Sequence, residues 1–129
     1  MKIKLTSIHV DDQEKALRFY TDVLGFVKKA DVSQGEYRWL TVTSPEEPDG
    51  SELVLEPDDN PAAKNYQQAL FQQGIPATMF YTDDLQRDYD RLAGKGVRFT
   101  VPLTREAWGS LATLDDTCGN LIQLTQLPH

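Results

Sequence analysis

The chain has 129 residues, of which 40% are hydrophobic and 26% are charged, and its formal net charge is −7 at pH 7. This size and composition are typical of one globular domain with a hydrophobic core and exclude a second domain of ordinary size. The 13 basic residues are scattered along an acidic sequence. A nucleic-acid partner is therefore not expected, because phosphates require clustered Lys and Arg.

The sequence carries no sign of a membrane segment or an export signal. It lacks a run of about eighteen apolar residues, and the start MKIKLTSIHV enters a strand pattern without the apolar block of a signal peptide. We therefore expect a cytoplasmic location. Cys118 is the only cysteine, which excludes an internal disulfide and a cysteine-based metal cluster.

The chain contains an internal repeat. The stretch LTSIHV (5–10) leads into Asp11-Asp12 and a helical pattern, and ATMFYT (77–82) leads into Asp83-Asp84 and a second helical pattern. The first pattern ends at LGF (24–26) and the second at KGV (95–97). A duplicated strand–helix unit predicts two similar halves, with any functional site between them.

The first half is predicted to contain a helix and several strands. Residues 3–10 alternate as a strand does, and Asp11 with Glu14 has the spacing of a capping box that opens a helix. Gly25 ends that helix, whose expected inward side chains are Ala16, Phe19, Tyr20 and Val23. Strands at 37–42 and 52–56 are separated by the turn residues Pro45, Pro48, Asp49 and Gly50, which predicts a hairpin.

A connector helix and the second half follow. Pro61 is placed to begin a helix over about 61–74, with Tyr66, Leu70 and Ala69 as its apolar stripe. In the second half we expect a strand at 77–82, a helix capped by Asp83 with Gln86, and strands at 97–101, 110–115 and 120–126. The predicted organisation is one domain, 1–129, with module one at about 1–58 and module two at about 75–127.

The strand faces that do not pack on a helix are the expected place for a site, because side chains alternate across a strand. In the late strands, Leu53, Leu55, Ile122 and Leu124 are expected to face the helices. The opposite face then offers a mixture of apolar and polar side chains, as small-molecule sites do. The candidate ligand-binding residues are Leu5, Ser7, His9, Trp39, Glu56, Ala77, Met79, Tyr81 and Gln123.

Four segments together resemble the vicinal oxygen chelate superfamily, the group of glyoxalase I, bleomycin-resistance proteins, fosfomycin-resistance enzymes and extradiol dioxygenases. They are VDDQEKALRFY (10–20), VLGF (23–26), ELVLE (52–56) and DDTCGNLIQL (115–124). The resemblance covers nearly the whole chain. It implies an α+β fold of tandem βαβββ modules that form a cupped, barrel-like mixed sheet, usually in a homodimer.

The same resemblance bears on a metal. Metal-dependent members place one ligand on each of four strands, commonly His, Glu, His and Glu. Carried over to this sequence, those positions fall on Leu5, Glu56, Ala77 and Gln123. Leu5 and Ala77 have no donor atom, so we expect no metal and no other cofactor. His9 is four residues from Leu5, about 13 Å along a strand, and is too far to replace it.

Two functions are favoured by the sequence, the second also in a less favoured metal-assisted form, and a third, non-catalytic scaffold role stays open because fold does not determine function. The first is a metal-free protein of the bleomycin-resistance type that binds a small organic molecule, neutral or cationic. The second is a lyase or isomerase of the glyoxalase kind, in which Glu56 moves a proton beside a carbonyl and Gln123, with His9 or Tyr81, positions the substrate. The natural ligand, and whether modules pair within a chain or by exchange between chains, stay undetermined.

Overall fold

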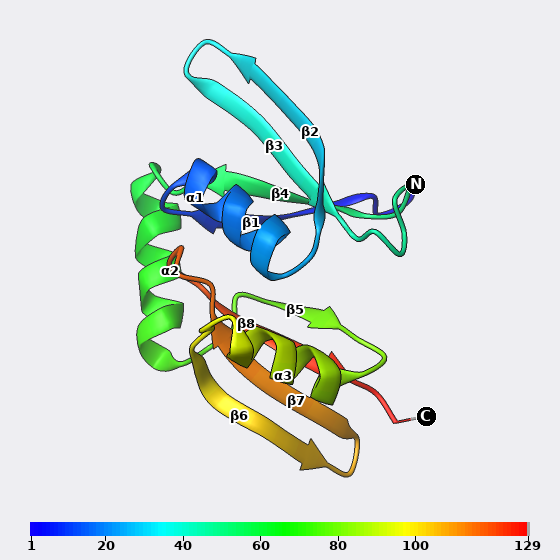
Figure 1. Ribbon diagram of the computed structural model, residues 1–129. Coiled ribbons are helices and arrows are strands. Elements are labelled where there is room, and N and C mark those ends of the chain that lie inside the picture. The colour runs from blue at the N-terminus through cyan, green and yellow to red at the C-terminus, as the bar shows by residue number, and fades with distance from the viewer. Residues whose placement is uncertain (129) are drawn as a thin grey trace. The chain divides into compact units, whose positions relative to one another are not determined.

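The computed structural model describes residues 1–128 (Figure 1). The elements of the first half are β1 (Leu5–Val10), α1 (Gln13–Arg18), the π-helical turn η1 (Phe19–Val23), β2 (Val27–Gln34), β3 (Tyr37–Thr43) and β4 (Glu52–Pro57). Then follow α2 (Pro61–Gln73), β5 (Thr78–Tyr81), α3 (Leu85–Gly94), β6 (Phe99–Glu106), β7 (Gly109–Asp115) and β8 (Leu121–Gln126). None of the helices in residues 1–128 has the length and apolar character that a membrane span requires.

The chain divides into two compact units, Met1–Asn65 and Tyr66–His129, with the division inside α2. Each unit contains a four-stranded mixed sheet, with the order β1-β4-β3-β2 in the first and β5-β8-β7-β6 in the second. In both, the first strand pairs in parallel with the last, and the other neighbours are antiparallel. The predicted α+β class and the tandem βαβββ modules are confirmed.

An aspartate begins the helix at the same place in both units. Asp12 has an extended backbone and its carboxylate accepts the Lys15 N–H at 2.9 Å, and Asp84 accepts the Arg87 N–H at 3.1 Å. The expected caps, Asp11 and Asp83, were each one residue early. Asp12 and Asp84 occupy the N-cap positions with non-helical backbone angles, and each carboxylate accepts the N–H three residues further on, as a cap does.

The helices cover one face of each sheet. Ala16, Phe19 and Tyr20 from the first helical segment are buried, as are Leu85 and Leu92 from α3. Beneath them lie the buried strand residues Leu53, Leu55, Ile122 and Leu124, as expected. Apolar burial of this kind is the main favourable term for each unit.

One strand was missed, the expected end of another was wrong, and so was the expected burial of Tyr66 on α2. Strand β2 was not predicted, because VKKADVSQ is exposed along almost its whole length and has no apolar alternation; it forms by pairing with β3. Strand β6 extends beyond the expected end at residue 101, since register shifts accommodate Pro102 on this edge strand. On α2, Tyr66 is 66% exposed and Gln67 is the buried residue.

Candidate functional site

Contacts of α1 define the two faces of the first sheet. The Glu14 carboxylate on α1 accepts from the Arg38 guanidinium on β3 at 2.8 Å, so Arg38 lies on the helix-covered face. Because neighbours alternate along a strand, Trp39 lies on the helix-free face. The register of β1, β3 and β4 places with it Leu5, Ser7, His9, Thr41, Thr43, Glu52, Val54 and Glu56. No Lys or Arg stands in this set.

A histidine and a carboxylate meet on this face. His9 on β1 and Glu56 on β4 are Cα partners at the ends of two parallel strands, and His9 Nε2 lies 3.7 Å from Glu56 Oε2. Their side chains are 38% and 34% exposed. The two groups form an ion pair when the imidazole is protonated, and Glu56 is reached by water rather than sealed in an apolar interior.

The second carboxylate of this face, Glu52, is held by a hydroxyl. Thr41 is completely buried, and its Oγ1 donates to Glu52 Oε1 at 2.7 Å while accepting the Ala30 N–H at 3.1 Å. Ala30 adjoins the register shift in the β2–β3 pair. Glu52 is thereby fixed with its second oxygen still able to accept a hydrogen bond.

The helix-free face of the second sheet is mostly neutral. By register it carries Met79, Tyr81, Leu111, Thr113, Leu121, Gln123 and Thr125, together with one carboxylate, Asp115, which is paired with Arg98 at 3.1 Å. Met79 and Tyr81 are 51% and 63% exposed, and Gln123 Nε2 donates to Thr125 Oγ1 at 3.1 Å. Ala77 precedes β5 and its N–H donates to the Leu121 carbonyl at 2.8 Å.

The predicted site residues therefore fall into two groups. Leu5, Ser7, His9, Trp39 and Glu56 share one face of the first unit, and Met79, Tyr81 and Gln123 share the equivalent face of the second, with Ala77 beside it. Each group is consistent with a ligand-contacting surface, since apolar area and a few hydrogen-bonding groups occur together. Their role in binding stays a prediction.

The register changes the comparison with a metal site. His9 and Tyr81 are equivalent in the repeat, each three residues before its helix cap, and they pair with Glu56 and Thr125. Two residues earlier, Ser7 pairs with Val54 and Met79 pairs with Gln123. The counterpart of Gln123 in the first unit is therefore Val54, so Glu56 and Gln123, the two positions carried over from the resemblance, are not equivalent in the repeat.

The residues present do not fit a divalent ion held by one donor from each of four strands. Leu5, Val54 and Ala77 have no donor atom, which leaves the neutral amide of Gln123 alone. Within residues 1–128, no three His, Cys, Asp or Glu side chains gather as metal ligands would.

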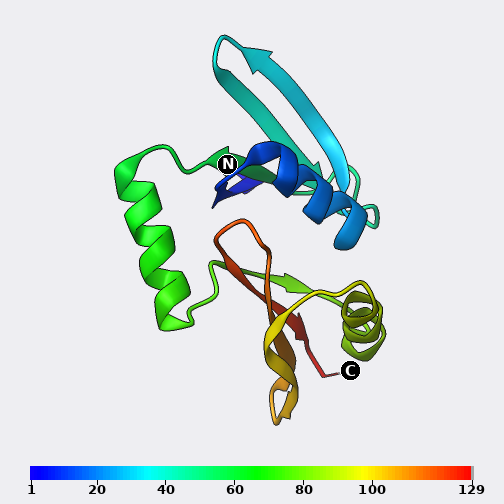
Figure 2. The same cartoon turned by 60° about the vertical axis from the view of Figure 1, so that its left-hand side comes forward.

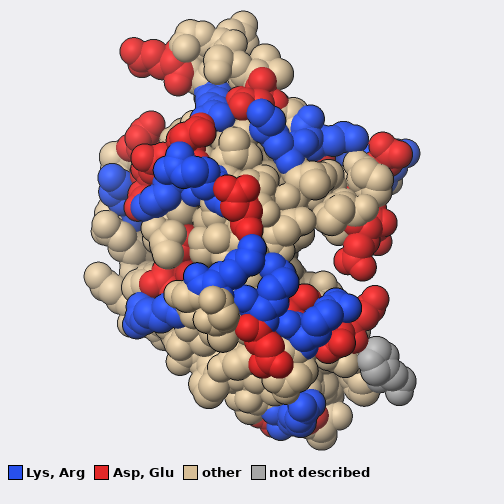
Figure 3. All heavy atoms as spheres, viewed as in Figure 1, with Lys and Arg blue, Asp and Glu red and all other residues tan. Residues whose placement is uncertain are grey.

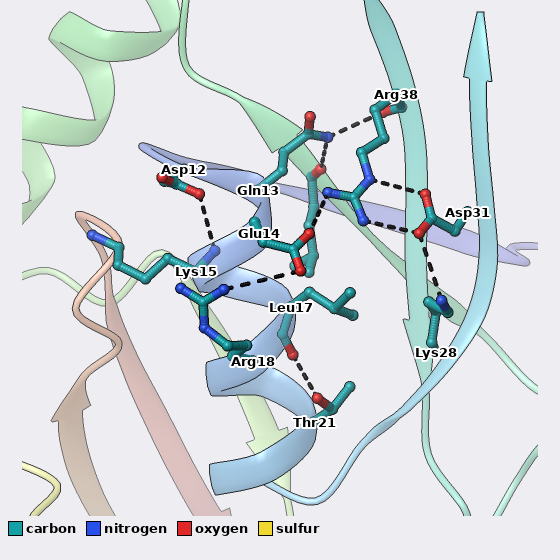
Figure 4. A network of polar contacts seen from close by, with 11 residues as sticks. Asp12, Gln13, Glu14, Lys15, Leu17, Arg18, Thr21, Lys28, Asp31 and Arg38 are labelled. Atoms are coloured by element: carbon teal, nitrogen blue, oxygen red, sulfur yellow. Dashed lines mark hydrogen bonds and ion pairs between the residues drawn. The ribbon is translucent and has the colours of Figure 1, made fainter.

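Polar contacts at the start of α1 fasten the β2–β3 hairpin (Figure 4). The Arg38 guanidinium donates to both oxygens of Asp31 at 2.9 Å, as well as to Glu14. These hydrogen bonds lower the pKa of Asp31 to about 2 and raise that of Arg38. Gln13 beside Glu14 donates its amide to two strand carbonyls, Arg38 O and Leu55 O. No role was predicted for Gln13 from the sequence. The available signal was that the equivalent residue of the repeat is the apolar Leu85, so that a polar side chain stands at position 13 where its counterpart is apolar.

The face of the molecule shown in Figure 3 has no single basic area. On the face shown in Figure 3, Lys and Arg alternate with Asp and Glu over both units. Many of these charges are paired, as in Lys15 with Asp11 at 3.0 Å and Arg98 with Asp115 at 3.1 Å. Such a surface does not favour a phosphate backbone.

Comparisons with known proteins agree with the fold. A family model for the Glyoxalase/Bleomycin resistance protein/Dioxygenase superfamily matches residues 2–124. The chain belongs to this superfamily. The resemblance inferred from the four sequence segments is thus confirmed for nearly the whole chain.

Three individual proteins match this chain over almost their full length. YurT of Bacillus subtilis (strain 168), named as an uncharacterized protein, is 55% identical over 126 residues, covering 98% of this chain and 99% of YurT. The crystal structure of UcmS2 matches with a TM-score of 0.84 and 29% identity, covering 97% of both chains. TnmS3, an antibiotic-binding protein from Streptomyces sp. CB03234, matches with a TM-score of 0.79 and 30% identity, covering 99% of this chain and 97% of TnmS3.

Proposed function

We propose that this protein binds a small organic molecule on the helix-free faces of its sheets without using a metal ion. The observation that supports the proposal is the lack of donor atoms at Leu5, Val54 and Ala77, which correspond to ligand positions of metal-dependent relatives by the resemblance and the strand register. Exposed apolar groups on the same faces, including Leu5 at 44% and Met79 at 51%, add contact area for a ligand. The likeness to an antibiotic-binding protein supports the same function.

The charge of the first face favours a neutral or cationic ligand. Glu52 and Glu56 lie on it without a Lys or Arg among the residues in register with them. The ring of Trp39 lies on the same face and can pack on a flat apolar group or on a cation. A planar aromatic cation combines these features in one ligand.

A pair of dyes tests this proposal. Proflavine is a planar aromatic cation and 8-anilinonaphthalene-1-sulfonate is an aromatic anion, and binding of each is followed by fluorescence titration. We expect tighter binding of proflavine, with the difference falling about fivefold in Glu56→Gln because one charge interaction near the surface is removed. Trp39→Ala should weaken the binding of proflavine. Trp108→Ala removes a 47% exposed ring in the β6–β7 turn and should leave proflavine binding unchanged. Equal binding of both dyes in all variants would contradict the proposal.

The metal-free part has its own test. Thermal unfolding is recorded with Ni²⁺, Zn²⁺, Mn²⁺ and Fe²⁺ and after treatment with a chelator. We expect no ion to raise the midpoint, because binding to the native state alone would stabilise it. A clear increase that is lost in Gln123→Ala or Glu56→Ala would show that a metal is held after all.

A second function is favoured by one observation, the 3.7 Å approach of His9 and Glu56. A carboxylate beside an imidazole can orient it or share its proton, which is the arrangement of a general base. In this alternative the protein is a lyase or isomerase of the glyoxalase kind that acts on a carbonyl substrate. Turnover of hemithioacetals that survives chelator and disappears in Glu56→Gln would select it.

The proposal includes the state and location of the protein. We propose a homodimer in the cytoplasm that has no nucleic-acid partner, since the sequence is acidic and its basic residues are scattered. Light scattering coupled to size-exclusion chromatography measures the mass directly. A monomer at micromolar concentration would contradict the dimer and leave the ligand proposal to its own test.

A further inference from the structure

In the first unit, strands β3 and β4 separate partway along their length, whereas the equivalent strands β7 and β8 of the second unit stay paired. Strands β3 and β4 are Cα partners only at Thr41–Val54, Val42–Leu53 and Thr43–Glu52, although β3 begins at Tyr37 and β4 continues to Pro57. Strands β7 and β8 pair without interruption from Ser110–Gln126 to Asp115–Leu121. Figures 1 and 2 both show the β2–β3 hairpin leaving the β1–β4 pair.

A side-chain amide occupies the place where the two strands part. Gln13 Nε2 donates to Arg38 O of β3 at 3.0 Å and to Leu55 O of β4 at 2.8 Å. Both carbonyls therefore point into the opening, and because alternate residues of a strand point the same way, so does the backbone of Leu40. Leu40 and Leu55 would be the next hydrogen-bonded pair after Val42 and Leu53 if the ladder continued.

The sequence of β4 makes the amide necessary. The pair after Leu40 and Leu55 would join Arg38 to Pro57, and proline has no N–H to donate to the Arg38 carbonyl. Gln13 provides that missing donor and serves Leu55 O as well. A buried carbonyl without a donor costs free energy, so one amide satisfies two groups that the parted ladder leaves open.

The repeat supplies a natural comparison. Gln13 follows the cap Asp12, and the residue that follows the cap Asp84 in the second unit is Leu85, which is 1% exposed. Leu85 has no side-chain donor, and the sheet beneath α3 has no opening to fill. Glutamine and an open ladder occur together in one unit, and leucine and a closed ladder in the other.

We propose that Gln13 is a positioning residue for the ligand-binding face of the first unit. If the ladder continued, Trp39 and Glu56 would be direct cross-strand neighbours, with Cβ atoms about 5 Å apart, and would pack on each other. By holding β3 away from β4, Gln13 keeps the indole and the carboxylate available to a ligand as separate contacts. This inference rests on the proposed function, which names both side chains as ligand contacts.

The test compares Gln13→Met with wild type by amide hydrogen exchange. Methionine has the length of glutamine without its donor, and Gln13→Glu is a second variant that keeps the shape but lacks donor protons when ionised. The matched control is Gln86→Met, which removes an exposed glutamine near the start of α3 that donates to Asp90. We expect the hydrogen-exchange rates of the Leu40 and Leu55 amides to differ at least tenfold from wild type in both Gln13 variants. In the control Gln86→Met these rates should equal those of wild type. Unchanged exchange in Gln13→Met would overturn the inference.

Titration with proflavine then separates the inference from the proposed function. We expect the dissociation constant to rise at least threefold in Gln13→Met and to be unaltered in Gln86→Met. If wild type does not bind the dye, the proposed function fails, while the exchange data still decide whether Gln13 sets the spacing of β3 and β4. If wild type binds and the variant binds equally well, the positioning role fails alone.

Discussion

The two units of this protein have the same strand order and the same helix cap but use different contacts to hold their sheets. In the first unit, an amide and an ion-pair network join α1 to a hairpin that has left its neighbour, through Gln13, Glu14 and Arg38. In the second, a buried leucine lies over a continuous ladder. A repeat can therefore keep its topology while polar contacts replace backbone pairing in one copy.

The helix-free faces of the two units also differ, in the charge of their side chains. The first carries Glu52, Glu56 and His9, and the second carries Met79, Tyr81 and the neutral amide of Gln123. Because the strands are equivalent, this difference comes from side-chain identity alone. Under the proposed function, we expect the first face to recognise charge on a ligand and the second to supply mainly apolar contact.

The largest expected effect comes from replacing Leu85 of the second unit with glutamine, the residue at the equivalent position, 13, of the first unit. Leu85→Gln buries an amide under α3 where no carbonyl is left open, and should reduce the free energy of unfolding by about 2 to 4 kcal/mol. The control Leu85→Met keeps the volume and should cost less than about 1.5 kcal/mol. Urea unfolding followed by circular dichroism measures both. Equal stability of Leu85→Gln and wild type would contradict the contrast between the units.

A glycine of each unit gives the next effect. Gly119 has φ +103°, and a Cβ there would lie 2.7 Å from Gln67 Nε2, which donates to the Cys118 carbonyl at 3.2 Å. Gly119→Ala should therefore cost about 2 kcal/mol or more, through strain and loss of this contact. Gly25 also has a positive φ, +94°, but nothing lies within 4 Å of its Cβ position. Gly25→Ala should cost only the strain, about 1 kcal/mol. Thermal unfolding of the two variants should show this order, and the reverse order would refute the explanation.

The two helix caps should contribute equally to the free energy of unfolding. Asp12→Ala and Asp84→Ala each remove a carboxylate that accepts one helical N–H, and each should cost about 1 kcal/mol of unfolding free energy. Asp11→Ala and Asp83→Ala are the matched controls, with losses below about 0.5 kcal/mol expected by chemical denaturation. A larger loss of unfolding free energy in Asp11→Ala and Asp83→Ala would indicate that these residues are the caps, as the sequence pattern predicted.

The smallest effect is a pH dependence confined to the first unit. Arg38 lowers the pKa of Asp31 from 3.8 to about 2, so Asp31 contributes stability above pH 4 that is lost as the pH falls toward 2. In Asp31→Asn this part of the acid destabilisation should be absent. Amide exchange of β2 and β3 between pH 5 and 2.5 measures it, and an identical pH profile in the variant would exclude the contribution.

Much of the fold was predictable because it is written in local patterns. The repeat, β1, β3, β4, α2, α3 and the last hairpin were all expected from periodicity, turn residues and caps, as were the helix-facing leucines. The missed strand β2 has no pattern of its own, since its residues are exposed and its structure depends on β3. Gln67 was missed on α2 because its burial depends on a turn 51 residues away.

By itself, the sequence determined the family, the α+β class and the absence of donor atoms at Leu5 and Ala77, because these follow from residue identity and short-range pattern. Only the tertiary structure decided that Glu56 pairs with His9, that Val54 is the counterpart of Gln123, and that the Gln13 amide bridges carbonyls of two strands. Strand register and side-chain contacts between distant segments are set by packing of the whole unit, and a shift of two residues along a strand changes both without altering the local pattern.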